Sequence, residues 1–221
     1  CIRDRTYLLE DMMGELHLSH ADVAPSFTDT GGDRRPAPGS LAADVEIEHG
    51  RYRLKRIYSA PMFGDGPAAP LDDLDLGAAV GDVIVSIAGQ PVTAERDLAE
   101  YLQGAAGKPT QLCLSASGRK GDERCARIKP VENDAPLRFA AWLDERQAIV
   151  DRLGGGRVGY LHSSDTMESG MAEFNAARYA QHEREGFVVD VRYNGGGMAA
   201  DYLIQTLTAP ELSRWIMPVS Y

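Results

Sequence analysis

Residues 157–193 contain the pattern that most constrains the fold, a short strand, a helix and a second strand. The strands read "RVGYLH" and "GFVVDVRY", and "MESGMAEFNAARYAQHERE" between them has helical periodicity. Two strands joined by a helix form a parallel, right-handed unit in nearly all proteins. The second strand is an uninterrupted apolar run, which predicts burial on both faces. The chain is therefore expected to contain an α/β layer.

Three consecutive glycines, Gly195–Gly197, follow the second strand. They lie at the carboxyl end of the strands, where open α/β sheets bind ligands, and a helix start there offers free N–H groups to an anion. Gly195, Gly197 and Ala200 satisfy the dinucleotide fingerprint, but no second strand with an acidic residue follows. A phosphate-binding P-loop is disfavoured because no Gly-Lys-Ser/Thr follows. A tight turn that simply needs glycine remains the alternative.

Residues 41–132 have a different organisation, that of short strands separated by turns. An alternating run bends at His49-Gly50, which predicts a β-hairpin. Further strands are expected at 82–87 and 110–116, with a helix near 95–103 and a last strand in "ERCARIKPV". This pattern predicts a small, partly open β-barrel.

The cysteines bear on the redox compartment. The chain has three, of which Cys113 and Cys125 are expected on adjacent strands of one hairpin. A bridge between them is an option, but so few cysteines in an odd number favour reduced thiols and a reducing compartment.

Three parts are expected along the chain. Residues 1–38 contain the end of a helix at 6–16 and a Gly/Pro-rich loop, residues 39–133 the small barrel, and residues 134–221 the α/β layer. The last part opens with a helix that Asp134 can cap, and the glycines after Leu153 end it.

Composition excludes several classes of partner. The net charge of -10 argues against nucleic acid and anionic membranes. No apolar run has the length of a membrane span, and no signal peptide is visible. The start at Cys1, without methionine, suggests a piece of a longer polypeptide. No cluster of histidine, cysteine and carboxylate residues has metal-ligand spacing, so neither a metal nor a cofactor is expected.

Four stretches of sequence together resemble a known family. "VGDVIVSIAGQPV" resembles a PDZ domain of the kind embedded in proteases, and "GRVGYLHSSDT" with "GFVVDVRYNGGG" resembles the catalytic domain of tail-specific (C-terminal-processing) serine peptidases. "MMGELHLSH" and "APLRFAAWLDERQAIVDRL" narrow the resemblance to tricorn-type proteases. The resemblance implies a mixed α+β fold, in which a PDZ-like domain precedes the first half of a crotonase-like α/β catalytic domain.

The resemblance also implies a catalytic site. His20 would be the general base, Ser19 would belong to the supporting relay, and Gly197 would donate its N–H to an oxyanion, with Gly196 as the alternative donor. The family's serine nucleophile and a relay glutamate match segments that this sequence does not contain. The parent would hydrolyse peptide bonds in peptides or unfolded proteins in the cytoplasm, while this chain alone would be inactive. Self-association into a homo-oligomer stays open.

Two alternative functions are also considered. The chain could be a non-catalytic PDZ module that binds peptides, or a crotonase-like domain for acyl-CoA chemistry. The embedded PDZ-like part and Ser19-His20 argue against the acyl-CoA alternative. Among other polar residues, Ser163-Ser164-Asp165 is expected to cap a helix, and Asp190 and Arg192 to form an ion pair or a contact at the sheet end.

Overall fold

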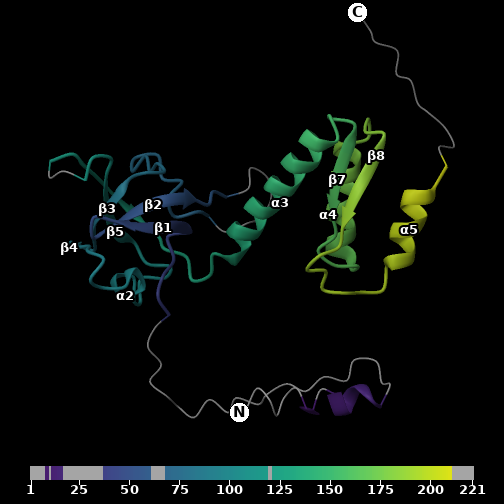
Figure 1. Cartoon of the computed structure of the whole chain (residues 1–221), viewed down its shortest axis with the longest axis horizontal. Coiled ribbons are helices and arrows are strands. Elements are labelled where there is room, and N and C mark those ends of the chain that lie inside the picture. Colours follow the sequence, from purple (N-terminus) through teal and green to yellow (C-terminus); the bar gives the residue numbers. More distant parts are fainter. Residues whose placement is uncertain (1–7, 10, 17–36, 61–67, 119–120, 211–221) are drawn as a thin grey trace, which may run out of the picture. The chain divides into compact units, whose positions relative to one another are not determined.

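The computed structural model describes residues 8–9, 11–16, 37–60, 68–118 and 121–210 (Figure 1). The chain consists of two units, residues 1–36 and residues 37–221. In the first unit, residues 8–9 and 11–14 are helical, as the apolar spacing predicted, and Leu8, Met12 and Leu16 are exposed.

The second unit begins with a β-hairpin. Strands β1 (Ala43–Glu48) and β2 (Arg51–Ile57) pair antiparallel. The predicted turn joins them, with φ of 51° at His49 and 73° at Gly50. Two consecutive positive φ angles give the twist that a two-residue hairpin needs, so the local sequence fixes this register.

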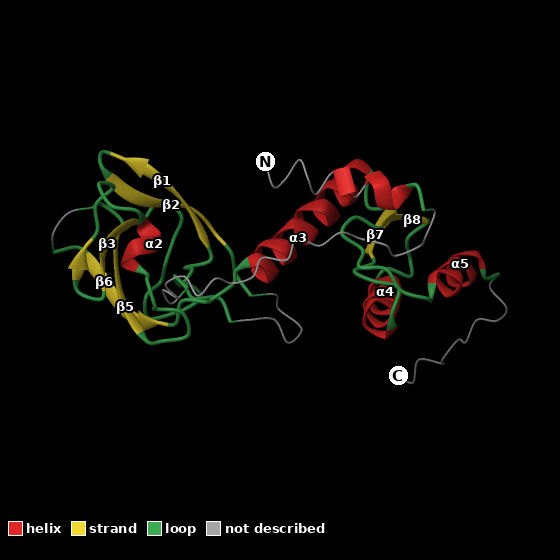
Figure 2. Ribbon diagram, turned by 90° about the horizontal axis from the view of Figure 1, so that it is seen from below, coloured by secondary structure: helices red, strands yellow, loops and turns green. Residues whose placement is uncertain are grey.

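Four more strands complete an antiparallel sheet: β3 (Val83–Ile87), β4 (Gln90–Pro91), β5 (Thr110–Ser115) and β6 (Glu123–Ile128). The order is β1-β2-β3-β5-β6, and β4 pairs with β3. The strands curve around helix α2 (Leu98–Tyr101), as Figure 2 shows. An isolated antiparallel bridge joins Ser40 to Val131, next to the two edge strands. The predicted antiparallel strands and the intervening helix are confirmed, whereas the closure of the sheet into a small barrel stays a prediction.

Helix α2 is shorter than the predicted range of 95–103. The Asp97 side chain accepts the Ala99 N–H at 2.8 Å and thereby starts the helix after Arg96. The core beneath it is built from aliphatic side chains of the strands, among them Leu54, Ile84 and Leu112, each at most 1% exposed.

The cysteines differ from the expectation. Cys113 and Cys125 do lie opposite each other on β5 and β6, but they form a disulfide instead of remaining reduced. The number of cysteines alone does not indicate which of them lie opposite each other in the fold. In the antiparallel register the two Cα atoms are 4.1 Å apart, so the side chains face each other and can bond.

Helix α3 (Ala135–Leu153) leads away from the PDZ-like part and packs against it at its first turns. Leu137 is fully buried among Ala42, Tyr58 and Ala69. Asp134 precedes the helix but makes no side-chain cap bond, contrary to the expectation.

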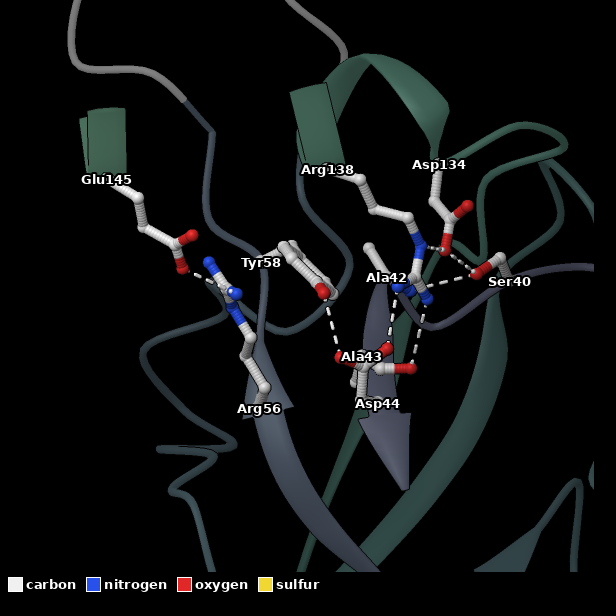
Figure 3. Close-up of polar contacts among 9 residues, drawn as sticks. All are labelled: Ser40, Ala42, Ala43, Asp44, Arg56, Tyr58, Asp134, Arg138 and Glu145. Carbon is white, nitrogen blue, oxygen red and sulfur yellow. Dashed lines mark hydrogen bonds and ion pairs between the residues drawn. The ribbon is translucent and has the colours of Figure 1, made fainter. Parts of the chain in front are cut away.

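Asp134 instead accepts hydrogen bonds from Ser40 Oγ at 2.8 Å and Arg138 Nε at 2.9 Å (Figure 3). Arg138 also donates to the Asp44 carboxylate at 2.6 Å and lies over the Tyr58 ring. A polar cluster thus ties the first turn of α3 to β1, because both carboxylates share the Arg138 guanidinium.

The last part is the predicted parallel unit. Strands β7 (Val158–His162) and β8 (Gly186–Asp190) pair parallel and are joined by helix α4 (Glu168–Ala180); helix α5 (Ala200–Thr208) follows. Leu161, Phe174 and Leu203 form the core on the face shared by α4 and α5. On the opposite face Tyr160 and His162 meet α3, whose Phe139 ring lies 5.3 Å from the His162 ring.

The prediction that β8 is buried on both faces is wrong for this chain. Val188 is 45% exposed, and Val191 just after the strand is 58% exposed. An apolar run shows that the side chains of a strand are suited to a core. They become buried only where another layer of the structure covers that face of the sheet. Within the described ranges, the helices include none long and apolar enough to cross a membrane.

Candidate active site at the carboxyl end of the parallel strands

The segments after β7 and β8 continue side by side beyond the regular strands. Gly195 N–H donates to Ser164 O at 2.9 Å, and Thr166 N–H donates to Gly196 O at 2.8 Å. Ala199 N–H then returns to Thr166 O at 3.0 Å, and Thr166 and Gly197 form a parallel bridge. The glycine turn is therefore held by the neighbouring segment and is not a free loop.

Two of the three glycines have conformations that other residues rarely adopt. The φ angles are 85° at Gly196 and 139° at Gly197. A Cβ added at Gly197 would lie 2.4 Å from Thr166 O, whereas nothing lies within 4 Å of one added at Gly196. Gly197 is required both by its backbone angle and by its close approach to Thr166.

The N–H groups of the turn differ in availability. The Gly196 N–H donates to the Asn194 side-chain oxygen at 2.7 Å. The Gly197 N–H has no acceptor within the described part of the chain, and Gly197 is exposed. A ligand oxygen could therefore be bound by Gly197 with no loss of an internal hydrogen bond, while binding by Gly196 would have to displace Asn194.

An ion pair lies directly before the turn, as the sequence predicted for these residues. The Asp190 carboxylate is 7% exposed and accepts Arg192 Nε at 2.9 Å and the Tyr160 hydroxyl at 2.8 Å. Hydrogen bonding to Arg192 holds the pKa of Asp190 well below its usual range. Burial, together with the hydrogen bond to Asp190, raises the pKa of Tyr160, so Tyr160 is a neutral donor at physiological pH.

Aromatic rings from α3 surround the same strand end. The Arg192 guanidinium lies 4.8 Å from the Trp142 ring centroid, and the His162 Nε2 donates to Arg192 O at 2.9 Å. Tyr193, next in the chain, is 75% exposed with φ of 62° and makes an edge contact with Trp142. Arg192 is thus held through its side chain and its carbonyl, which fixes the backbone entering the turn. Leu143, Gln147, Tyr160, His162, Glu173, Ala177 and Gln181 line an adjacent pocket of about 240 Å³.

The serines near the turn have structural contacts. Ser163 is fully buried and donates to Asp165 O, and Ser164 donates to Glu173 at 2.8 Å. Asp165 accepts the Met167 and Gly170 N–H groups at 2.8 and 2.9 Å, so it caps the start of α4 as predicted.

The predicted histidine base and its neighbour cannot be related to this turn. Ser19 and His20 lie outside the described residues, and so does His17. Of the predicted site residues, the structure places Gly196 and Gly197 in one turn. Among the described residues, no group of three or more histidine, cysteine or carboxylate side chains could hold a metal ion.

Comparison with known proteins accounts for both parts of the fold. Residues 39–133 match the family model described as the tricorn protease PDZ domain. Tricorn protease homolog 1 of Streptomyces coelicolor is 36% identical over 99% of this chain, and tricorn protease of Thermoplasma volcanium is 28% identical over 95%. A crystal structure of the tricorn protease superposes on 92% of this chain with a TM-score of 0.76 at 27% identity. The chain thus resembles tricorn proteases over nearly its whole length.

The similarity to tricorn proteases accounts for the order of the parts but does not show the activity of this chain. The chain covers 20% of each of those two relatives and 19% of the solved tricorn structure. The tricorn resemblance seen in the sequence is therefore confirmed, and the catalytic roles remain to be proposed.

One residue of the site was missed by sequence reasoning. Asn194 stands directly before the three glycines and bonds to both sides of the turn. The signal was available, because asparagine often bonds to backbone two residues on. Its other bond, to Ser163, depends on the parallel pairing and could not be read locally.

Proposed function

We propose that this chain is part of a serine-type peptidase that hydrolyses peptide bonds in peptides or unfolded proteins. His20 acts as the general base, Ser19 belongs to its relay, and the Gly197 N–H stabilises the tetrahedral oxyanion. Gly196 is the weaker candidate donor, because its N–H is bonded to Asn194. The proposal needs no cofactor.

The observation that carries the proposal is the Gly197 N–H, which has no acceptor among the described residues, whereas the N–H groups of Gly195 and Gly196 are both bonded. A fixed donor that has no internal partner suits a negative charge that develops during a reaction, because the site does not need to reorganise. Each such donor contributes roughly 3 kcal/mol to transition-state stabilisation. The similarity to tricorn proteases supports acyl transfer to water as the reaction.

The proposal places the nucleophilic serine and a relay glutamate outside residues 1–221. The serines nearest the turn support this. Ser163 is buried, and Ser164 and Ser169 donate to Glu173 and Asp165. Among the described residues, none of these three hydroxyls is hydrogen-bonded to a histidine, which supports a nucleophile elsewhere.

The test is the substitution His20→Ala in the full-length protein. Removal of a general base should lower kcat for a short fluorogenic peptide by roughly 10²- to 10⁴-fold. His182→Ala is the matched control, because that side chain is 72% exposed and contacts the Tyr179 carbonyl and Glu183. A His20→Ala protein that retains more than a tenth of wild-type turnover would refute the assignment.

The wider features of the parent follow from the same proposal. The proposed substrate is a peptide or an unfolded protein. The proposed division of the chain is 1–38, 39–133 and 134–221. The parent is proposed to act in the cytoplasm, where a homo-oligomer would be consistent with the exposed apolar residues of β8 and α5. Gel filtration and subcellular fractionation test these points.

A second candidate function rests on the PDZ-like part. Strand β1 stands at the end of the sheet order, and a groove of about 340 Å³ lies between its beginning and α2, with Ala43, Leu98 and Ala99 in its lining. An edge strand beside an apolar groove suits an added peptide strand. If the chain is a binding module only, Ala99→Trp abolishes the binding of an extended peptide, whereas His20→Ala leaves peptide binding unchanged. Glu95→Trp, an exposed position that does not line the groove, is the control.

A further inference from the structure

Asn194 connects the ends of the two parallel strands through its side chain. Its Nδ2 donates to Ser163 O at 3.0 Å and lies 3.3 Å from Ser163 Oγ. Its Oδ1 accepts the Gly196 N–H at 2.7 Å. Ser163 is fully buried, so the side chain is attached on one side to a rigid point and on the other to the glycine turn.

The bonds around Asn194 fix consecutive peptide planes. The plane that ends at Gly195 is held by the bond from its N–H to Ser164 O. The plane between Gly196 and Gly197 is held by the bond from Thr166 N–H to Gly196 O. In a trans peptide the C=O and the following N–H point in opposite directions, so the Gly197 N–H points away from Thr166.

The peptide plane that joins Gly195 to Gly196 stands between the two planes just described. Among the described residues, its N–H is held by the Asn194 side chain. Both flanking residues are glycines, and Gly196 has a φ of 85°, so no side chain of the turn itself opposes rotation of this plane. The next plane is attached to this one through the Gly196 Cα, so without Asn194 the bond from Thr166 N–H to Gly196 O would alone have to hold the direction of the Gly197 N–H. The Asn194 amide thus supplies the restraint that the glycines cannot provide.

We propose that Asn194 is a positioning residue that holds the oxyanion donor of Gly197 and keeps the Gly196 N–H out of the site. This inference rests on the proposed function, because it assigns to Asn194 a part in stabilising the same tetrahedral intermediate. Asn194 does not touch the substrate; it acts through the glycine turn.

The test compares three variants in the full-length protein. Asn194→Ala removes both contacts. Asn194→Asp keeps an acceptor for the Gly196 N–H but replaces the donor to Ser163 O by a second acceptor. Asn175→Ala is the matched control, since this asparagine lies on α4 and, within the described residues, its side chain has a single long hydrogen bond, of 3.5 Å, to the Tyr202 hydroxyl. Active sites are counted by complete labelling with a fluorophosphonate, so that kcat refers to folded enzyme alone.

The expected result separates positioning from folding. Asn194→Ala should lower kcat per labelled site by roughly 10- to 100-fold, because small displacements of a catalytic donor have effects of this size. KM should stay within about threefold, since the donor acts on the transition state. The inhibition constant of a peptide aldehyde, whose adduct carries the oxyanion, should rise in parallel with the loss of kcat/KM. Asn194→Asp should lose less than Asn194→Ala, and Asn175→Ala should match wild type.

Other outcomes overturn the inference. If kcat per labelled site and the aldehyde inhibition constant are unchanged in Asn194→Ala, or in Asn194→Asp where the alanine variant does not fold, the residue has a structural role only. A loss confined to KM would also exclude positioning of the donor. A wild-type protein without peptidase activity would instead refute the proposed function, and this inference with it.

Discussion

Arg192 Nε donates to Asp190 Oδ1 at 2.9 Å, although a single residue separates the two in the chain. Asp190 is almost fully buried at the end of β8, while the Arg192 side chain is 58% exposed and rests on Trp142. The pair therefore joins the buried strand end to the aromatic rings of α3 and directs the chain into the glycine turn. Its contribution can be measured through the pH dependence of stability.

Asp190→Asn should lower the free energy of unfolding of the chain by about 1.5–3 kcal/mol at pH 7, the range for hydrogen bonds to a charged group. The folded-state pKa of Asp190 is depressed by Arg192. The stabilisation is therefore present above the unfolded pKa of about 4 and is lost as the pH falls toward the folded value. Urea unfolding should show a difference between wild type and variant that shrinks from pH 7 to pH 3. Asp144→Asn, an exposed position on α3, should show no such trend. A difference that grows on acidification would contradict the assignment.

Substitutions in the glycine turn should differ strongly between neighbours. Gly197→Ala would place a Cβ within 2.4 Å of Thr166 O, so the bridge between these residues should open at a cost of about 3 kcal/mol or more. Gly196→Ala meets no atom and should cost only about 1–2 kcal/mol for its left-handed backbone. Thermal or urea unfolding of both variants measures the difference. Equal destabilisation would mean that the close approach of Gly197 to Thr166 is not maintained in solution.

Arg138→Ala should weaken the attachment of α3 to the PDZ-like part. Arg138 is 39% exposed, so its ion pairs with Asp44 and Asp134 are screened by solvent and contribute about 1 kcal/mol together. Loss of the contact with the Tyr58 ring adds about 0.5–1 kcal/mol. Limited proteolysis between the PDZ-like part and α3 should become faster, and added salt should reduce the difference from wild type. Arg152→Ala, exposed in the last turn of the same helix, is the control. Unchanged cleavage of Arg138→Ala would show that Leu137 alone secures the helix.

Reduction of the disulfide should destabilise the PDZ-like part. The bond closes a loop with a sequence separation of 12, for which the chain-entropy model gives about 3 kcal/mol. Unfolding in the presence and absence of a reductant measures the effect, and Cys113→Ala with Cys125→Ala should remove the difference. A midpoint that does not change on reduction would show that the β5–β6 hairpin constrains the unfolded chain as strongly as the bond does.

Residues 1–221 alone should not react as a serine hydrolase. The proposed nucleophile lies outside this chain, and Ser163, the serine at the end of β7, is fully buried. Incubation with a fluorophosphonate probe should leave the chain unlabelled, whereas the full-length protein should be labelled once per chain. Stoichiometric labelling of the isolated chain would show that a serine within these residues is the nucleophile.

The sequence alone determined the elements and their order. The hairpin turn at His49-Gly50, the parallel unit and the position of the glycine turn depend on local conformational preferences and on periodicity. These properties are carried by residues close together in the chain, which is why they could be read from it.

The tertiary structure decided the partners of individual groups. The Gly196 N–H bonds locally to Asn194, but Ser163, which accepts from the Asn194 side chain, and Thr166, which donates to the Gly196 carbonyl, both come from the end of the other strand. Asp134 was predicted to cap the helix, but its side chain accepts hydrogen bonds from Ser40 and Arg138 instead. The disulfide formed because the register of β5 and β6 brings two cysteines face to face. Hydrogen bonds and disulfides are selected by distance in space, and that distance is set by the packing of segments far apart in the sequence.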